Sequence, residues 1–184
     1  DGFEGASVDD IARASGVSKA TLYSYFPDKR RLFMEVARIE CCRQADEAVQ
    51  LIDVTAKPSQ VLRSAGLRFL EILLSDFNLR TFRICCAEAD RFPELGQDFY
   101  QSGPLLARER LSEYLSAAVE RGELAIDDMD LAADQFAELC KADLFPRALF
   151  GVQTRFSAPE RARVVDAAVA VFLSRYATGA GEPA

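Results

Sequence analysis

Apolar residues recur with helical spacing almost from end to end of this 184-residue chain, and this pattern constrains its fold more than any other feature. Between residues 59 and 74, for example, Leu62, Phe69 and Leu73 fall on one stripe of a helix with 3.6 residues per turn. No run alternates convincingly between apolar and polar residues with the period of two that a half-buried strand requires. The sequence therefore predicts an all-α fold.

Capping residues, glycines and prolines divide this pattern into separate helices. Ser7, Ser18, Asp28 and Ser157 are placed to cap helix starts. The expected helices cover residues 7–14, 18–25, 28–52, 59–74, 79–90, the stretch from a break at 92–94 to 121, 127–151 and 157–177. Prolines predict a bend at Gly103-Pro104 and a kink at Pro146. A linker after residue 52 divides the chain into an N-terminal unit, 1–52, and a C-terminal unit, 53–184.

Composition narrows the classes of function. The net charge is −7 and histidine is absent, which removes the commonest metal ligand and the usual acid–base group near neutral pH. Phosphate-binding glycine loops, nucleophile elbows and metal-ligand clusters are also missing, so we expect no enzyme, metal or cofactor. The five cysteines show no C-x-x-C spacing, and no apolar run has the roughly 18 residues of a membrane span. We expect a cytoplasmic protein with reduced thiols.

One basic stretch stands out in this acidic chain. Residues 15–31 carry Lys19, Lys29, Arg30 and Arg31 against a single acid. Two short helices joined by a tight glycine turn are the sequence form of a helix-turn-helix, whose second helix enters the DNA major groove with its N-terminal residues first. A lysine at a helix start opposes the helix dipole, and a nearby phosphate would compensate it. The small core expected to hold the two helices together is Ile11, Val17, Leu22 and Phe26.

The order Gly16-Val-Ser, Thr21-Leu-Tyr, Tyr25-Phe and Lys29 resembles the DNA-binding domain of TetR-family transcriptional regulators. The segments 87–95, 99–104 and 142–151 are similar to the AefR-like group of C-terminal regulatory domains. This resemblance implies an all-helical homodimer that represses transcription from a double-stranded DNA operator and releases it on binding a small effector. The family's first helix and basic N-terminal arm are missing here, apart from a final turn, so we expect further residues upstream.

The resemblance places DNA contacts in and beside the second short helix. Ser7, Tyr25 and Lys29 fall where the family grips phosphates, and the base-reading positions fall within residues 19–23. The complete set of expected DNA contacts is Ser7, Ser18, Lys19, Ala20, Thr21, Tyr23, Tyr25 and Lys29. Arg30 and Arg31 depart from the family, which often has an acid there. They fit either extra phosphate contacts or a solvated charge run.

The C-terminal helices carry the other expected sites. A pocket for a small apolar or aromatic effector would be lined by Phe69, Leu73, Phe82, Cys86, Phe92, Phe99, Tyr114, Phe136 and Cys140, although aromatics at helical spacing also fit a plain core. The last two long helices are apolar on more than one face, which suggests a four-helix contact between two subunits. The residues expected in that contact are Leu131, Leu149, Val164, Val165, Ala168, Phe172 and Tyr176.

Two other forms of control stay open. A DNA binder could act without a small ligand, through a protein partner or through cysteine oxidation. The pairs Cys41-Cys42 and Cys85-Cys86 lie on expected helices, where neighbouring side chains point about 100° apart and cannot bridge. We therefore expect buried structural thiols. In the family, effector binding pivots the helix over 28–52 and changes the separation of the two recognition helices, which must match one turn of DNA.

Overall fold

The computed structural model describes residues 7–50 and 55–179, without the side chains of residue 45 and residues 47–50, and this part of the chain is almost entirely helical. Apart from one isolated bridge between Leu124 and Ala177, the described residues form no β-structure. The elements are α2 (Val8–Ser15), α3 (Lys19–Tyr25), α4 (Lys29–Gln50), α5 (Pro58–Leu73), α6 (Asp76–Glu88), α7 (Pro93–Tyr100), the π-helix η1 (Gln101–Leu105), α8 (Leu106–Glu120), α9 (Met129–Lys141), α10 (Leu144–Leu149) and α11 (Ala158–Tyr176). The predicted all-α fold is confirmed.

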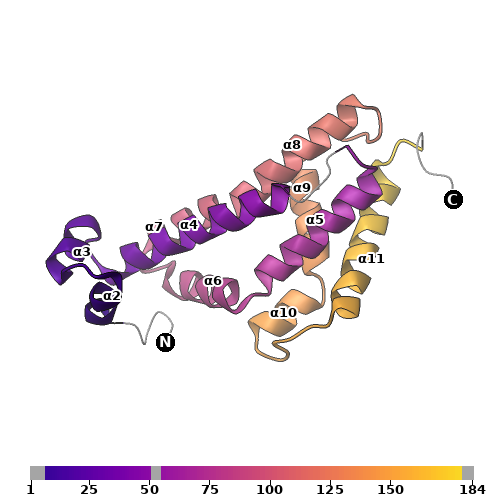
Figure 1. The fold of residues 1–184 in the computed structure, drawn as a ribbon. Coiled ribbons are helices and arrows are strands. Elements are labelled where there is room, and N and C mark those ends of the chain that lie inside the picture. The colour runs from indigo at the N-terminus through magenta and orange to yellow at the C-terminus, as the bar shows by residue number, and fades with distance from the viewer. Residues whose placement is uncertain (1–6, 51–54, 180–184) are drawn as a thin grey trace.

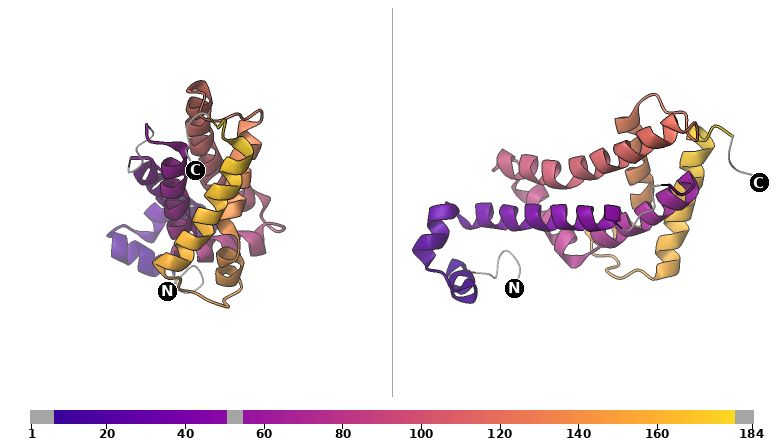
Figure 2. Two further views of the ribbon diagram at one scale, coloured as in Figure 1. Left: turned by 90° about the vertical axis from the view of Figure 1, so that its right-hand side faces the viewer. Right: turned by 45° about the horizontal axis from the view of Figure 1, so that its top comes forward.

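The two short helices lie apart from the rest of the molecule. Figure 1 shows α2 and α3 at one end, and the long α4 leads from them into the body. There α4 runs beside α8, as the right-hand view in Figure 2 shows. The single long helix α4 thus connects α2 and α3 to the C-terminal helices.

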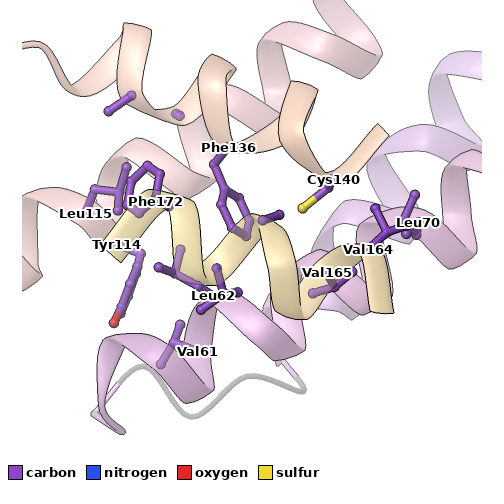
Figure 3. Packing of buried hydrophobic residues seen from close by; sticks show 14 of the residues in the cluster. Val61, Leu62, Leu70, Tyr114, Leu115, Phe136, Cys140, Val164, Val165 and Phe172 are labelled. Carbon is purple, nitrogen blue, oxygen red and sulfur yellow. The ribbon is translucent and has the colours of Figure 1, made fainter. Parts of the chain in front are cut away.

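The main core lies among α5, α8, α9 and α11. Helix α11 packs against both α5 and α9, and α8 packs against α9. Leu62, Leu115 and Val165 are fully buried there, and the rings of Phe136 and Phe172 meet edge to face with centroids 5.4 Å apart (Figure 3). This geometry is a preferred arrangement for aromatic pairs.

A second, smaller core ties the front of α4 to α6 and α7. Met34, Cys85 and Leu95 are each 3% exposed, and one comes from each of the three helices. Three phenylalanines, Phe33, Phe92 and Phe99, cover the cluster. The end of α4 nearest the two short helices therefore rests on α6 and α7.

The helix expected over 127–151 is interrupted, and the reason is a turn at Asp143. Asp143 has φ 64° and ψ −55°, and the N–H of Leu144 donates to the carbonyl of Ala142 at 2.7 Å. This is a γ-turn of the rare, positive-φ kind. Pro146 consequently lies in the first turn of α10, where its missing N–H costs nothing, and the predicted kink within one helix is wrong.

Two other boundaries differ from expectation. Helix α6 begins at Asp76 instead of residue 79 because the Ser75 hydroxyl caps it and accepts from the Asn78 N–H at 3.3 Å. The bend expected at Gly103-Pro104 takes the form of the π-helical turn η1, with Pro104 inside it. The predicted division after residue 52 lies outside the described residues, and α5 begins at Pro58.

A close approach at Gly66 fixes how tightly α5 meets α11. A Cβ at this position would lie 2.8 Å from Val165 Cγ1 and 3.1 Å from Cys140 Sγ. Because overpacking typically costs about 1–3 kcal/mol, we expect Gly66→Ala to lower the free energy of unfolding, although alanine's helix propensity returns part of that cost. Urea unfolding at fixed protein concentration measures the change.

A matched control exists for this substitution. Gly96 also lies inside a helix, but a Cβ there would meet only Ala89 Cβ at 3.7 Å, an ordinary contact. Gly96→Ala should therefore leave stability unchanged or raise it by up to about 1 kcal/mol. Equal stability of the two variants would show that the space between Gly66 and Val165 accommodates a Cβ without a cost in stability.

Candidate nucleic-acid interface

The α2–α3 unit is built by local capping. The Ser7 hydroxyl caps α2 and accepts from the Asp10 N–H at 3.1 Å. Gly16 then turns the chain with φ 71°, a left-handed conformation that glycine adopts without the steric cost of a side chain. Ser18 caps α3 and accepts from the Thr21 N–H at 3.0 Å. These interactions confirm the predicted helix starts and hold α3 at a fixed angle to α2.

Helix α3 leaves its side chains available to a partner. None of its residues is buried, and Tyr23 and Tyr25 are 44% and 77% exposed. The eight residues that we expected to contact DNA are all exposed except Lys29, which is half-buried: Ser7, Ser18, Lys19, Ala20, Thr21, Tyr23, Tyr25 and Lys29. The structure therefore places the predicted base-reading residues on an open surface at the end of the molecule.

The core beneath this surface differs in part from the prediction. Ile11, Leu22 and Phe26 are half-buried as expected, whereas Val17 is 39% exposed. Ala12 is the buried residue of the pair of helices. The prediction of Val17 as a core residue is therefore wrong, and Val17 directly follows the turn at Gly16.

Lys19 has a partner within the protein. Its ammonium donates to Asp9 Oδ2 at 2.9 Å, and both side chains are more than half exposed. This hydrogen bond and the Asp9 charge raise the pKa of Lys19. The carboxylate thus offsets the unfavourable position of a cation at a helix start, which we had expected a phosphate to do.

Asp28 caps the start of α4 as predicted. Its Oδ1 accepts from the backbone N–H groups of Arg30 and Arg31 at 2.9 and 3.0 Å. The side-chain hydrogen bond from Arg30, followed by the one from the Arg31 N–H, lowers the pKa of the Asp28 carboxyl. The cap fixes the direction in which α4 leaves the DNA-binding unit.

Arg30 and Arg31 both contact the C-terminal half of the chain. The guanidinium carbon of Arg30 lies 3.5 Å from the ring centroid of Phe92, and Arg31 Nη1 lies 2.9 Å from Asp98 Oδ2. These contacts within the chain do not fit a purely solvated charge run, and a phosphate contact by either arginine stays a prediction. Sequence reasoning missed the contacts because Phe92 and Asp98 are more than 60 residues away along the chain.

The residues expected to line an effector pocket lie in the two cores and on their margins. Tyr114, Phe136 and Cys140 are buried in the main core, with Phe69 and Leu73 packed against it. Phe92 and Phe99 cover the second core. Phe82 bridges the two regions, edge to face with Phe99 at 5.9 Å and with Phe145 at 5.3 Å. Cys86 is exposed. None of the nine residues lines the groove between α9 and α11.

This groove, of about 650 Å³, runs between α9 and α11. Its wall is mainly apolar, and its charged and amide side chains come from both helices. The lining residues are Leu131, Asp134, Gln135, Glu138, Leu139, Ala142, Val171, Phe172, Arg175 and Tyr176. Leu131 and Val171 are 52% and 53% exposed, so this face presents apolar surface to solvent.

Only part of the predicted subunit contact lies on this face. Leu131, Phe172 and Tyr176 line the groove, and Leu149 is half-buried elsewhere. Val164, Val165, Ala168 and Phe172 are 5%, 0%, 3% and 2% exposed and belong to the main core. The structure does not support Val164, Val165 and Ala168 as contact residues, because side chains already enclosed by α5 and α9 have almost no surface left for a partner.

Cys85 and Cys140 are buried as expected of structural thiols, whereas Cys41 and Cys42 are half-buried and Cys86 is exposed, so the prediction of a buried thiol is wrong for Cys86. Burial raises the pKa of the Cys85 and Cys140 thiols to about 12 in each case, which keeps them protonated at neutral pH. A thiol reacts through its thiolate, so these two positions are poorly suited to oxidation. Within residues 7–50 and 55–179 no group of three potential ligands could hold a metal ion. No described helix is both long and apolar enough to cross a membrane.

Comparison with known proteins agrees with this architecture. The model of the bacterial regulatory proteins of the tetR family matches residues 1–36, and that of the AefR-like transcriptional repressor C-terminal domain matches residues 60–178. A search of curated proteins finds no match.

Solved structures give a similar result. A TetR-family transcriptional regulator from Mesorhizobium loti has 29% sequence identity and a TM-score of 0.84, with 96% of this chain and 89% of that chain covered. The flavonoid-responsive regulator FrrA has 32% identity and a TM-score of 0.76, with coverage of 97% and 90%. A TetR-family regulator from Pseudomonas syringae has 26% identity and a TM-score of 0.68, with coverage of 96% and 89%. This chain belongs to the TetR family of DNA-binding transcription regulators, and its C-terminal domain is of the AefR-like type.

Proposed function

We propose that this regulator is a repressor that binds a palindromic operator as a homodimer and leaves it when a small apolar or aromatic effector binds. The observation that carries the proposal is α3. Its N-terminal residues are exposed, no acid occurs from Ala14 through Pro27, and Ser18, Thr21 and Tyr23 supply hydroxyl donors. Such groups suit the phosphates and base edges of a major groove.

The proposed contacts divide by role. Ser7, Tyr25 and Lys29 lie at the edges of the helix pair and would hold phosphates. Lys19, Ala20, Thr21 and Tyr23 would face base edges, with Ser18 between the two groups. Because Asp9 holds Lys19 in the free protein, DNA must draw this ammonium from the carboxylate. The aspartate thereby favours sites that offer Lys19 a strong acceptor.

The α9–α11 groove is the proposed contact between subunits. Two copies related by a twofold axis would each place Leu131 and Val171 against the partner's groove, which covers apolar surface that is exposed in one chain. Such an arrangement leaves α2 and α3 of each subunit free, because they lie far from α11 (Figure 1).

Selection of bound duplexes from random DNA tests the operator directly. We expect a palindrome whose half-sites are about one helical turn, or roughly 34–36 Å, apart. A single unpaired half-site would contradict the dimer, and failure to enrich any sequence would contradict specific reading by α3.

The effector proposal is supported by FrrA, the flavonoid-responsive regulator that aligns with nearly the whole chain. The aromatic cluster of Phe82, Phe99 and Phe145 offers ring contacts of the kind that such a ligand uses. We expect flavonoids to lower affinity for the selected duplex, and a straight-chain fatty acid of similar size to lower it less. If neither lowers affinity, control by a protein partner becomes the better proposal.

Lys29 provides a separate test of the phosphate contacts. Lys29→Ala should weaken binding to every duplex by a similar factor, because a phosphate contact carries no sequence information. The slope of log affinity against log salt should fall by about one for each subunit. Fluorescence anisotropy between 50 and 200 mM salt measures this slope, and an unchanged slope would show that Lys29 does not contact phosphate.

A further inference from the structure

We infer that Arg30 and Arg31 position the DNA-binding helices against α7, and that α7 is the element through which the regulatory half alters that position. The inference rests on the proposed operator binding, and it assigns to two cations in the basic stretch a role other than DNA contact. Three independent features of the structure support it.

The first feature is the pair of contacts across the two halves. Arg31 Nη1 and Asp98 Oδ2 are 2.9 Å apart, and the two side chains are 48% and 39% exposed. Arg30 covers the Phe92 ring at 3.5 Å and also bonds to the Asp28 cap. A planar guanidinium stacks on an aromatic ring and is also attracted to its face. The contact therefore opposes rotation of the first turn of α4 relative to Phe92. Both arginines thus anchor the first turn of α4 to the two ends of one short helix.

The second feature is the small core directly behind these contacts. Met34 of α4 is enclosed with Leu95 of α7 and Cys85 of α6. Cys85 Sγ approaches Met34 Sδ at 3.9 Å. A displacement of α7 would therefore carry the front of α4 with it, because interlocked buried side chains move together.

The third feature is the way α7 is bounded. It begins at Pro93, directly after Phe92, whose φ and ψ of −135° and 77° are not helical, and it passes directly into the π-helical turn η1. The buried Ser102 in η1 donates to the carbonyl of Asp98 at 2.8 Å. Short π-helical turns are frequent at functional sites because they change the register of a helix. The eight-residue helix α7 thus follows a non-helical residue and continues into a π-helical turn, and a change in the register of that turn would shift α7.

Hydrogen–deuterium exchange with the duplex selected by this protein tests the inference without an effector. In the wild-type protein we expect DNA to slow exchange in residues 19–25 and also in residues 93–105. In Arg31→Gln and in Asp98→Asn, DNA should still slow exchange in 19–25, whereas the protection of 93–105 should be lost. Each variant should change operator affinity about two- to five-fold, the range for an exposed ion pair.

Arg38→Gln is the matched control. It removes the same charge from α4, but its ion pair with Glu35 stays within that helix. The control should keep the protection of 93–105. The double variant Arg31→Glu with Asp98→Arg should restore the protection, and Asp98→Asn should have no further effect in an Arg31→Gln background.

Two results would overturn the inference. One is Asp98→Asn with the same exchange pattern as Arg38→Gln. The other is Arg31→Gln with a salt slope lower by about one per subunit and unchanged protection of α7, which would make Arg31 a phosphate contact. If the wild-type protein selects no duplex, the proposed function itself is contradicted. If it selects a duplex but the variants give either of the two results above, only this inference is contradicted.

Discussion

Replacing Phe172 by alanine is expected to lower the free energy of unfolding by about 3–5 kcal/mol, the range for a buried phenylalanine. Phe172 is 2% exposed, and its ring centroid lies 5.4 Å from that of Phe136 and 4.8 Å from that of Tyr176. The cavity would open at the junction of α9 and α11, which frame the proposed subunit contact. Urea unfolding at several protein concentrations measures the loss.

The dependence of stability on protein concentration shows whether Phe172 acts in the core of one chain or in the contact between subunits. Loss of core packing should persist at every concentration, whereas a weakened subunit contact matters less as the protein becomes monomeric. Val171→Ala is the matched control, because Val171 is the preceding residue and is 53% exposed. It should change single-chain stability by less than about 0.5 kcal/mol and raise the dimer dissociation constant. A large loss of single-chain stability in Val171→Ala and a small one in Phe172→Ala would contradict the placement of Phe172 in the core and Val171 on the surface.

Lys19→Ala is expected to have the largest effect on DNA binding. A base contact of this kind is worth about 1–3 kcal/mol, and a dimer makes it twice, so affinity for the selected palindrome should fall roughly 30-fold or more. The helix itself should tolerate the change, because alanine favours helix and the substitution removes a cation from the positive end of the dipole. Anisotropy titrations with the palindrome and with a scrambled duplex measure affinity and preference together. An equal loss for both duplexes would make Lys19 a phosphate contact.

Asp9→Asn tests the role of Lys19 by removing the charge of its hydrogen-bond partner. The substitution keeps the size of the side chain while it removes the charge that holds the Lys19 ammonium at 2.9 Å. We expect tighter binding to both duplexes, because a carboxylate near the phosphates is lost and Lys19 is released. Weaker binding would instead show that Asp9 orients Lys19 for base contact.

The sequence predicted the local structure well where a few neighbouring residues determine it. The Ser157–Glu160 capping box is present with both of its hydrogen bonds, because its partners are three residues apart. The glycine turn and the caps at Ser18 and Asp28 are confirmed for the same reason. The family resemblance then supplied the arrangement of helices, which local signals do not determine.

Predictions failed where long-range packing decides the outcome. The second apolar stripe of α11 indicated a partner subunit, yet α5 covers one face and α9 the other, so Val165 and Ala168 are buried within one chain. The contact between Arg31 and Asp98 was likewise not predicted, since the two residues are 67 positions apart. Charge and periodicity alone carry no information about which distant segment a side chain will meet.

The unequal size of the two cores has a consequence for how this regulator could be tuned. Three buried side chains, Met34, Cys85 and Leu95, hold the DNA-reading end, whereas the α5–α8–α9–α11 core is far larger. Local opening follows the least-buried region, so we expect the end of α4 next to α2 and α3 to open before the α5–α8–α9–α11 core does. Substitutions at Met34, Cys85 or Leu95 would therefore change how readily this end of α4 moves. None of the three is a proposed contact to effector or DNA. Natural variation at these positions could thus adjust how strongly DNA binding responds to the effector without changing which DNA sequence is bound.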